Sequence, residues 1–264
     1  MQLNEFQQYL KLNTGSKDTV TSYHAQVKKF FNNKTEFSQE TVNDYLVSRV
    51  DAGVAKNTLN QDIKALKQYA KFKKMIIEFP KIKTGNIKVR VYLTLKELED
   101  NIFPMFTLLF DNYHKRELVL RFLFFTGLRL KEFVTLKREN IDLESRQVTI
   151  CKTKSKRDRV IKFPTQLQED IKVFFRIEPE QENAFNVSKS YLKWTLRKIT
   201  KDLKYPKKLT PHVFRHSFAK HCLKMGMSIE RVQILLGHSD LKTTMIYANP
   251  TQEEALEDYD KYIK

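Results

Sequence analysis

The segment from Thr210 to Tyr247, TPHVFRHSFAKHCLKMGMSIERVQILLGHSDLKTTMIY, constrains the fold of this chain more than any other. Thr210 can cap a helix whose first position is Pro211, where the missing N–H costs nothing. A second, shorter helix is predicted to open after Ser228 and to stop at Gly237. Two capped helices in quick succession therefore predict a compact helical frame.

The first of these helices carries titratable side chains on one face. His212, Arg215 and His216 lie at positions i, i+3 and i+4, which neighbour one another on a helix surface. His238 stands at the exit turn of the second helix, and Tyr247 ends the segment. Taken singly, such residues are more often structural, since a lone HxxxH usually packs in a core and more rarely binds zinc.

The motifs PHVFRH and LLGHSDLKTTMIY resemble the C-terminal half of the tyrosine recombinases, the phage integrase family, and most of all its Xer-type members. The resemblance implies that His212, Arg215 and His238 belong to an active site, with His216 beside them, and that Tyr247 is the nucleophile. Four residues match in order and spacing, so a purely structural explanation does not suit the set.

The chemistry of a DNA phosphodiester accounts for these residue types. Its oxygens are negative, so a catalyst must neutralise the charge that grows as a fifth oxygen approaches phosphorus, and guanidinium groups do this well. A tyrosine hydroxyl, with a pKa of about 10, needs a nearby proton acceptor, and histidine suits that role near neutral pH. The departing sugar oxygen needs a proton, which a lysine can supply.

The motif TGLRLKEFVTL resembles the first arginine block of the same family. The resemblance implies that Arg129 is the second catalytic guanidinium, and Glu132, one helical turn further on, can orient it. The alternative is a surface ion pair worth a few tenths of a kcal/mol.

A β-hairpin with a basic tip is predicted between Gln147–Cys151 and Arg159–Phe163. The resemblance implies that a lysine on this hairpin is the general acid, and aligning DRVIKF places it at Lys154. The flanking glycines typical of the family are absent, which leaves Lys152 and Lys156 as alternatives. Basic residues of the tip that are not the acid are expected to bind phosphate: Lys152, Lys156 and Arg157.

Four helices are predicted in the first 80 residues, at Leu3–Leu12, Lys17–Phe31, Gln39–Val50 and Thr58–Met75, with caps at Ser16, Ser38 and Asn57. The fourth carries a lysine stripe beside its apolar stripe. A solvated charged face is the alternative to a DNA-binding edge, but the net charge favours phosphate contact. The stripe consists of Lys64, Lys67, Lys71 and Lys74.

The domain organisation follows from two local signals. PKIKTGNIKVRVY is basic and has no apolar period, which predicts a linker at residues 81–92, and Thr94 with Glu97 makes a capping box that opens a new unit. We therefore expect a helical, SAM-like core-binding domain at 1–80 and a catalytic domain at 93–264. Further helices are predicted at Lys115–Phe125, Thr165–Arg176 and Ser188–Lys201.

Composition narrows the partner. The chain has 264 residues and a net charge of +17, with 48 Lys and Arg against 31 Asp and Glu, which favours a polyanion. The most apolar run, LVLRFLFF, is short and interrupted by Arg121, and the start of the chain does not read as a signal peptide. Two cysteines make no disulfide framework. We expect a cytoplasmic, nucleoid-associated protein with no membrane partner.

Together these features predict a mainly α protein with a small antiparallel β-sheet, a two-domain C-shaped clamp on double-stranded DNA. The expected function is site-specific recombination through a 3′-phosphotyrosyl intermediate at a specific DNA site, without metal or cofactor. Two alternatives are a type IB topoisomerase-like strand relaxer and a catalytically silent DNA-binding protein.

Assembly is predicted from the end of the chain. Thr251 and Glu254 can cap a short helix with an apolar side and an acidic outer face. By resemblance to Xer-type proteins, this helix is expected to dock on the next protomer of a DNA-bound tetramer. Docking on its own catalytic domain is the alternative.

Overall fold

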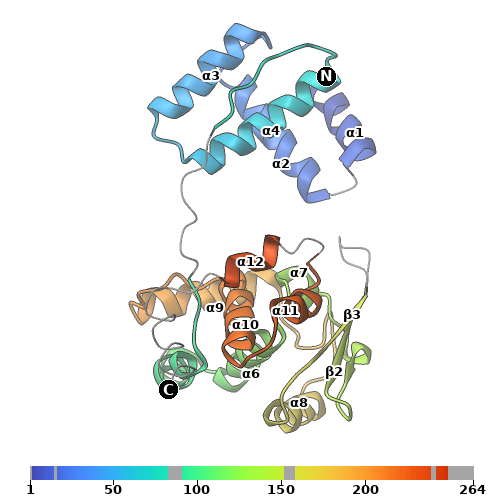
Figure 1. Ribbon diagram of the computed structural model, residues 1–264, viewed down its shortest axis with the longest axis vertical. Coiled ribbons are helices and arrows are strands. Elements are labelled where there is room, and N and C mark those ends of the chain that lie inside the picture. The colour runs from blue at the N-terminus through green and yellow to red at the C-terminus, as the bar shows by residue number, and fades with distance from the viewer. Residues whose placement is uncertain (1, 15–16, 83–90, 152–157, 239–241, 249–264) are drawn as a thin grey trace. The chain divides into compact units, whose positions relative to one another are not determined.

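The computed structural model describes residues 2–14, 17–82, 91–151, 158–238 and 242–248. Contacts divide the chain into two compact units, Met1–Lys88 and Val89–Lys264, each with its own buried core (Figure 1). The mainly helical class with a small antiparallel sheet is confirmed. The predicted linker lies for the most part outside the described ranges, so its boundaries stay predictions, as does the predicted helix that begins near residue 251.

The first unit is a four-helix unit built around aromatic rings. Its helices are α1 (Gln2–Thr14), α2 (Lys17–Phe31), α3 (Gln39–Asp51) and α4 (Lys56–Phe72). The fully buried ring of Tyr69, on α4, meets Phe6 of α1 and Phe37 edge-to-face, with centroids 5.0 and 4.8 Å apart. Such contacts between rings fix how α4 lies against its neighbours.

Of the predicted helix N-caps in this unit, the one for α3 is confirmed and the one for α4 is wrong. Ser38 caps α3, as predicted, and the structure adds a capping box with Thr41. The prediction of Asn57 as the cap of α4 is wrong: Ala55 is the N-cap, and its carbonyl already accepts from Thr58 N–H, so Asn57 lies inside the first turn. The predicted cap Ser16 is outside the described residues.

The lysines predicted along α4 are all exposed, but they do not all lie on the helix. Lys64, Lys67 and Lys71 point outward from α4. Lys74 follows the helix end with a φ of 54°, because the chain leaves α4 after Phe72. The lysine stripe on the helix is therefore shorter than the sequence predicts.

The second unit packs helices against a three-stranded sheet. Its α-helices are α5 (Phe106–Leu109), α6 (Tyr113–Thr126), α7 (Leu130–Val134), α8 (Gln166–Ile177), α9 (Lys189–Asp202), α10 (Pro211–Lys224), α11 (Ile229–Leu236) and α12 (Lys242–Ala248). Shorter helical turns cover Glu97–Ile102, Phe103–Met105 and Arg138–Asn140. Along the described stretches, no helix is long and apolar enough to cross a bilayer.

The sheet has the order β1 (Ile141–Asp142), β2 (Gln147–Ile150) and β3 (Arg159–Lys162), and both pairings are antiparallel. The predicted hairpin is thereby confirmed, with a short third strand that the sequence did not predict. Ile150 pairs with Arg159, so the two strands stay in register up to the basic segment between them. Residues 152–157 of that segment are outside the described ranges.

The centre of this unit is the contact between α6 and α10, which lie side by side (Figure 1). Thr210 caps α10 by accepting from Val213 N–H, with Pro211 at the first helical position, as predicted. Leu93 N–H donates to the buried hydroxyl of Ser217 on α10 over 2.7 Å, which fixes the start of the unit to the same helix. Helix α10 is thus held at its cap and along its buried face.

Gly127 ends α6 in the left-handed conformation, with a φ of 59°. A Cβ at this position would lie 2.5 Å from Cδ1 of Phe218 on α10. Only glycine allows both the backbone turn and the close approach of the two helices. The turn places Arg129 at the N-cap of α7.

We expect Gly127→Ala to destabilise the second unit by about 3 kcal/mol, because a left-handed alanine costs about 1–2 kcal/mol and the clash with Phe218 adds overpacking strain. Gly226→Ala is the matched control, since its φ is also positive, at 86°, but no atom lies within 4 Å of its Cβ. Urea unfolding of both variants measures the difference, and equal losses would contradict the role of Phe218.

Candidate active site

The centre of the candidate site is the buried carboxylate of Glu132 on α7. Arg129 donates to it twice, from Nη1 to Oε1 over 2.7 Å and from its backbone N–H to Oε2 over 2.8 Å. Arg159 of β3 binds the same carboxylate in a bidentate manner, which we call the fork. Its Nη1 lies 3.0 Å from Oε1 and its Nη2 lies 2.6 Å from Oε2. Two guanidinium groups therefore share one carboxylate.

Burial alone would raise the pKa of Glu132, but the hydrogen bonds and charge of Arg159, with the hydrogen bonds of Arg129, outweigh it and lower the pKa to about 2. Glu132 is accordingly ionised throughout the physiological range. Its charge is what allows the guanidinium groups to lie this close together.

Arg159 was predicted only as the first residue of a strand, and its part in the site was missed. The sequence did hold a signal, since alternation along β3 places residue 159 on the same inner face as Ile161. An arginine on the core side of a strand needs a buried partner. Arg159 finds two, since its Nε also donates to the carbonyl of Leu235 over 2.9 Å.

Arg215, on α10, is buried and donates hydrogen bonds to two backbone carbonyls. Its Nη1 donates to the Gly127 carbonyl over 2.7 Å, and its Nη2 donates to the Leu236 carbonyl over 2.6 Å. Burial, together with repulsion from Arg129, lowers its pKa to about 9, and the charge of Glu132 acts in the opposite direction. Arg215 thus lies within electrostatic reach of Arg129.

His238 follows the left-handed cap Gly237, as predicted, and is held by α12. Its Nδ1 lies 2.8 Å from the buried hydroxyl of Thr244. Burial, followed by the charges of Arg215 and Arg129, lowers the pKa of His238 to about 4. The imidazole is therefore neutral near pH 7, with one proton that the Thr244 contact can assign to a particular nitrogen.

Tyr247 lies on α12, is buried, and has two histidine rings near its own. The ring of His216 is 5.0 Å from it between centroids, and the ring of His238 is 6.2 Å away and nearly parallel. Helix α12 packs against α10, which carries His216, and against α11, which ends just before His238. The negative form of Tyr247 would be stabilised by Arg215, since the two interact electrostatically.

The structure thus brings together six of the predicted residues, Arg129, Glu132, Arg215, His216, His238 and Tyr247. His212 is exposed on the first turn of α10 and lines a groove with residues of α9. The predicted acid Lys154, and with it Lys152, Lys156 and Arg157, lies outside the described residues, between the ends of β2 and β3.

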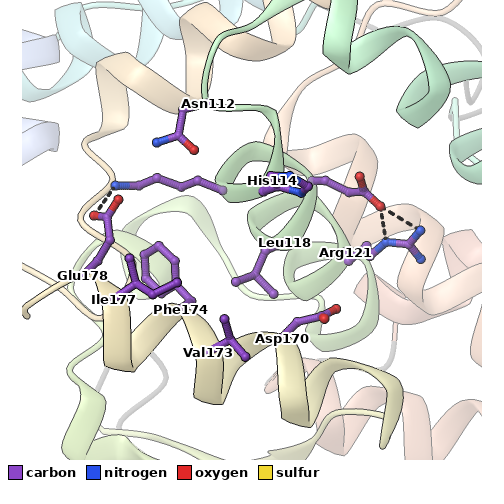
Figure 2. A pocket seen from close by; sticks show the side chains of 11 residues that line it. Asn112, His114, Leu118, Arg121, Asp170, Val173, Phe174, Ile177 and Glu178 are labelled. Carbon is purple, nitrogen blue, oxygen red and sulfur yellow. Dashed lines mark hydrogen bonds and ion pairs between the residues drawn. The ribbon is translucent and has the colours of Figure 1, made fainter.

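A separate cavity of about 480 Å³ lies between α6 and α8 (Figure 2). Lys115 pairs with Glu178 at one end of it, and Arg121 pairs with Glu117 over 2.9 Å, whereas Phe174 contributes an apolar wall. The residues that line it include none of those predicted for catalysis. The cavity is therefore distinct from the candidate site.

Comparison with known proteins identifies the family of the chain. Residues 99–254 match the phage integrase family, and residues 3–75 match the N-terminal SAM-like domain of phage integrases. The tyrosine recombinase XerA of Pyrococcus horikoshii is 32% identical over 272 residues, which cover 98% of this chain and 92% of that protein.

Two solved structures share the fold. The Tn1549 transposon integrase in complex with circular intermediate DNA superposes with a TM-score of 0.75 at 17% identity, over 98% of each chain. The crystal structure of XerA recombinase gives a TM-score of 0.57 at 23% identity, over 99% of this chain and 98% of that one. The chain belongs to the phage integrase family. Within it the chain is a tyrosine recombinase of Xer type, an enzyme of site-specific DNA recombination, as the motifs predict.

We expect Glu132→Gln to destabilise the second unit by about 3–5 kcal/mol at neutral pH, because it leaves two clustered guanidinium groups without a counter-charge. The pKa of Glu132 is depressed from 4.5 to about 2, so its stabilising contribution is complete above pH 4.5 and is lost as pH falls towards 2. Unfolding curves across this range should show the gap between wild type and variant closing. A gap that stays constant with pH would contradict the role of the charge.

Proposed function

We propose that this recombinase cuts and rejoins DNA through a covalent bond between Tyr247 and a 3′-phosphate. The observation that carries the proposal is the position of Tyr247, buried beside the rings of His216 and His238 and within electrostatic reach of Arg215. In the first step the Tyr247 oxygen bonds to phosphorus, its proton passes to a base, and the bond to the 5′-oxygen breaks. In the second step a 5′-hydroxyl of the partner strand attacks the phosphotyrosine and releases Tyr247.

The energy of the broken phosphodiester is kept in the phosphotyrosine, so religation requires no nucleotide hydrolysis. We assign the neutralisation of charge on the phosphate oxygens to Arg129 and Arg215, whose guanidinium groups are held by Glu132 and by backbone carbonyls. This arrangement is in place before DNA binds, and such preorganised charge acts without having to rearrange during the reaction.

The proton transfers are assigned to three further residues. Neutral His238 donates to a phosphate oxygen if its Nδ1 accepts from Thr244, which keeps the ring proton on Nε2. His212, on the exposed first turn of α10, receives the tyrosine proton. Lys154, on the hairpin, protonates the leaving oxygen, with Lys152 and Lys156 as the alternatives.

Double-stranded DNA is the proposed partner, and the second unit offers a surface for it. A groove of about 830 Å³ runs along α9 to His212. Arg197 and Lys201 lie one helical turn apart on its wall, joined there by Lys193 and Lys208, and none of the described residues that line it is acidic. A basic groove that ends at a catalytic histidine suits a phosphate backbone that leads into the active site.

The first unit supplies a second basic edge, the exposed face of α4 with Lys64, Lys67 and Lys71. We propose that both units bind one duplex, as a clamp, and that four subunits assemble on paired sites in the nucleoid. The five acidic residues within 253–260 support the assembly, since an acidic segment in a basic protein favours a protein surface over DNA. Sedimentation of the protein with its DNA site measures the number of subunits, and a monomer on paired sites would exclude the tetramer.

The decisive experiment uses a nicked DNA site that traps the covalent adduct. Wild type should form the adduct in the presence of EDTA, and Tyr247→Phe should bind the site but form none, because only the phenol oxygen can attack. Tyr191→Phe is the control, since Tyr191 lies on α9 beside Arg116, away from the candidate site, and should leave the adduct intact. An adduct formed by Tyr247→Phe would refute the assignment.

The groove is tested by the salt dependence of binding. Each phosphate contact contributes about −0.9 to the slope of log K against log salt, so Arg197→Gln with Lys201→Gln should make the slope shallower by up to about 2. Lys172→Gln with Arg176→Gln is the matched control, with the same spacing and charge change on α8. Equal slopes for both double variants would contradict the proposal that DNA binds in this groove.

A further inference from the structure

Arg159 is a buried arginine of the site, and its side chain is only 7% exposed. It extends from the first residue of β3 to two other parts of the site, the carboxylate of Glu132 and the carbonyl of Leu235 at the end of α11. None of the proposed chemical steps uses Arg159, and its Nε, Nη1 and Nη2 are all engaged by protein acceptors.

The fork of Arg159 determines how the Glu132 carboxylate is turned. Both oxygens of Glu132 accept from Arg159, and a bidentate pair of this kind fixes the plane of the carboxylate. Arg129 then meets an oxygen whose position is already set, at 2.7 Å from its Nη1. The remaining Nη2 of Arg129 is held 3.2 Å from the Gly237 carbonyl. The orientation of Arg129 therefore depends on Arg159 through Glu132.

The same side chain also supports the turn that precedes His238. A Cβ at Gly237 would lie 3.0 Å from Cδ of Arg159 and 3.1 Å from its Nη1, so the turn lies directly on the guanidinium. The Leu235 carbonyl beside it accepts from Nε over 2.9 Å. Since the Gly237 carbonyl in turn accepts from Arg129, one buried guanidinium sets both contacts that hold Arg129.

We propose that Arg159 is a positioning residue of the strand-cleavage reaction, which acts through Glu132 to aim Arg129 at the phosphate. The proposal rests on the function proposed above. Loss of the fork lets Glu132 turn and Arg129 move, and a misplacement of about 1 Å in such a group costs about 100-fold in rate. Arg159 itself does not touch the substrate.

A change in the substrate separates this role from a merely structural one. A methylphosphonate at the scissile position replaces a charged oxygen with a methyl group, so it is neutral before attack and carries one negative charge fewer than the phosphodiester in the transition state, which leaves less charge for Arg129 to neutralise. A variant that misplaces Arg129 should be slow on the phosphodiester and much less impaired on the methylphosphonate. A variant that only loosens the fold should be impaired equally on both.

The experiment measures single-turnover formation of the Tyr247 adduct on both substrates, with full-length protein. Arg159→Met should lose about 100-fold relative to wild type on the phosphodiester and less than about 10-fold on the methylphosphonate. Arg129→Ala should show the same pattern. Arg159→Lys, which keeps the charge but cannot form the fork, should fall between wild type and Arg159→Met and keeps the test valid if the methionine variant does not fold.

Arg138→Met is the control for a structural arginine. Arg138 also donates to a backbone carbonyl, that of Phe175, and stacks on its ring, away from the candidate site. Its loss should affect both substrates alike.

Two results would overturn the proposal for Arg159 alone, given a wild-type adduct: a full cleavage rate for Arg159→Met on the phosphodiester, or equal losses on the two substrates for the Arg159 variants. Absence of an adduct from wild type would overturn the proposed function, and this inference with it.

Discussion

The architecture of the site depends on a single buried negative charge. Arg129, Arg159 and Arg215 repel one another in a region from which water is largely excluded, and Glu132 is the carboxylate that offsets them. A buried ion pair of this kind contributes little net stability compared with apolar packing of the same volume. The three guanidinium groups and the single carboxylate together leave a fixed excess of positive charge, which suits the phosphate binding proposed for this site.

Backbone carbonyls around this charge also hold the guanidinium groups in place. Arg215 is held by carbonyls at Gly127 and Leu236, each at or next to a helix end, where carbonyls lack partners within the helix. Gly127 and Gly237, both in the left-handed conformation, end α6 and α11 so that carbonyls without partners in the helix accept hydrogen bonds from guanidinium groups. Neutral His238 adds a donor or acceptor without adding to the positive charge.

Much of the fold was accessible from the sequence because local signals and packing agree. Thr210 with Pro211, Ser38 and Gly237 each mark a helix end at the position where the structure has it. Asn57 failed as a cap because the preceding residues, which carry no capping side chain, already start the helix at Lys56. Helix α7 and helix α12 were not predicted as elements, since each is only a turn or two long and is stabilised by its neighbours.

The candidate residues and the pairing of Glu132 with Arg129 could be proposed from the sequence, but the connections between distant segments could not. That Glu132 serves two arginines depends on the approach of β3 to α7, which are distant in sequence. Arg159 carried only the weak signal of a charged residue on an inward-facing strand position, and Thr244 carried none. Contacts between distant segments are set by the tertiary packing, which no local pattern encodes.

The pairing of Ile150 with Arg159 has a consequence for protein engineering. The last residue pair between β2 and β3 includes Arg159, which binds Glu132. The basic segment, residues 152–157, lies beyond this pair in the sequence. Exchange of residues 152–157 for those of another recombinase would leave this rung, and the guanidinium that depends on it, in place. Chimaeras joined at this rung should therefore take the basic segment of the donor while retaining the pairing of Arg159 with Glu132 of the host.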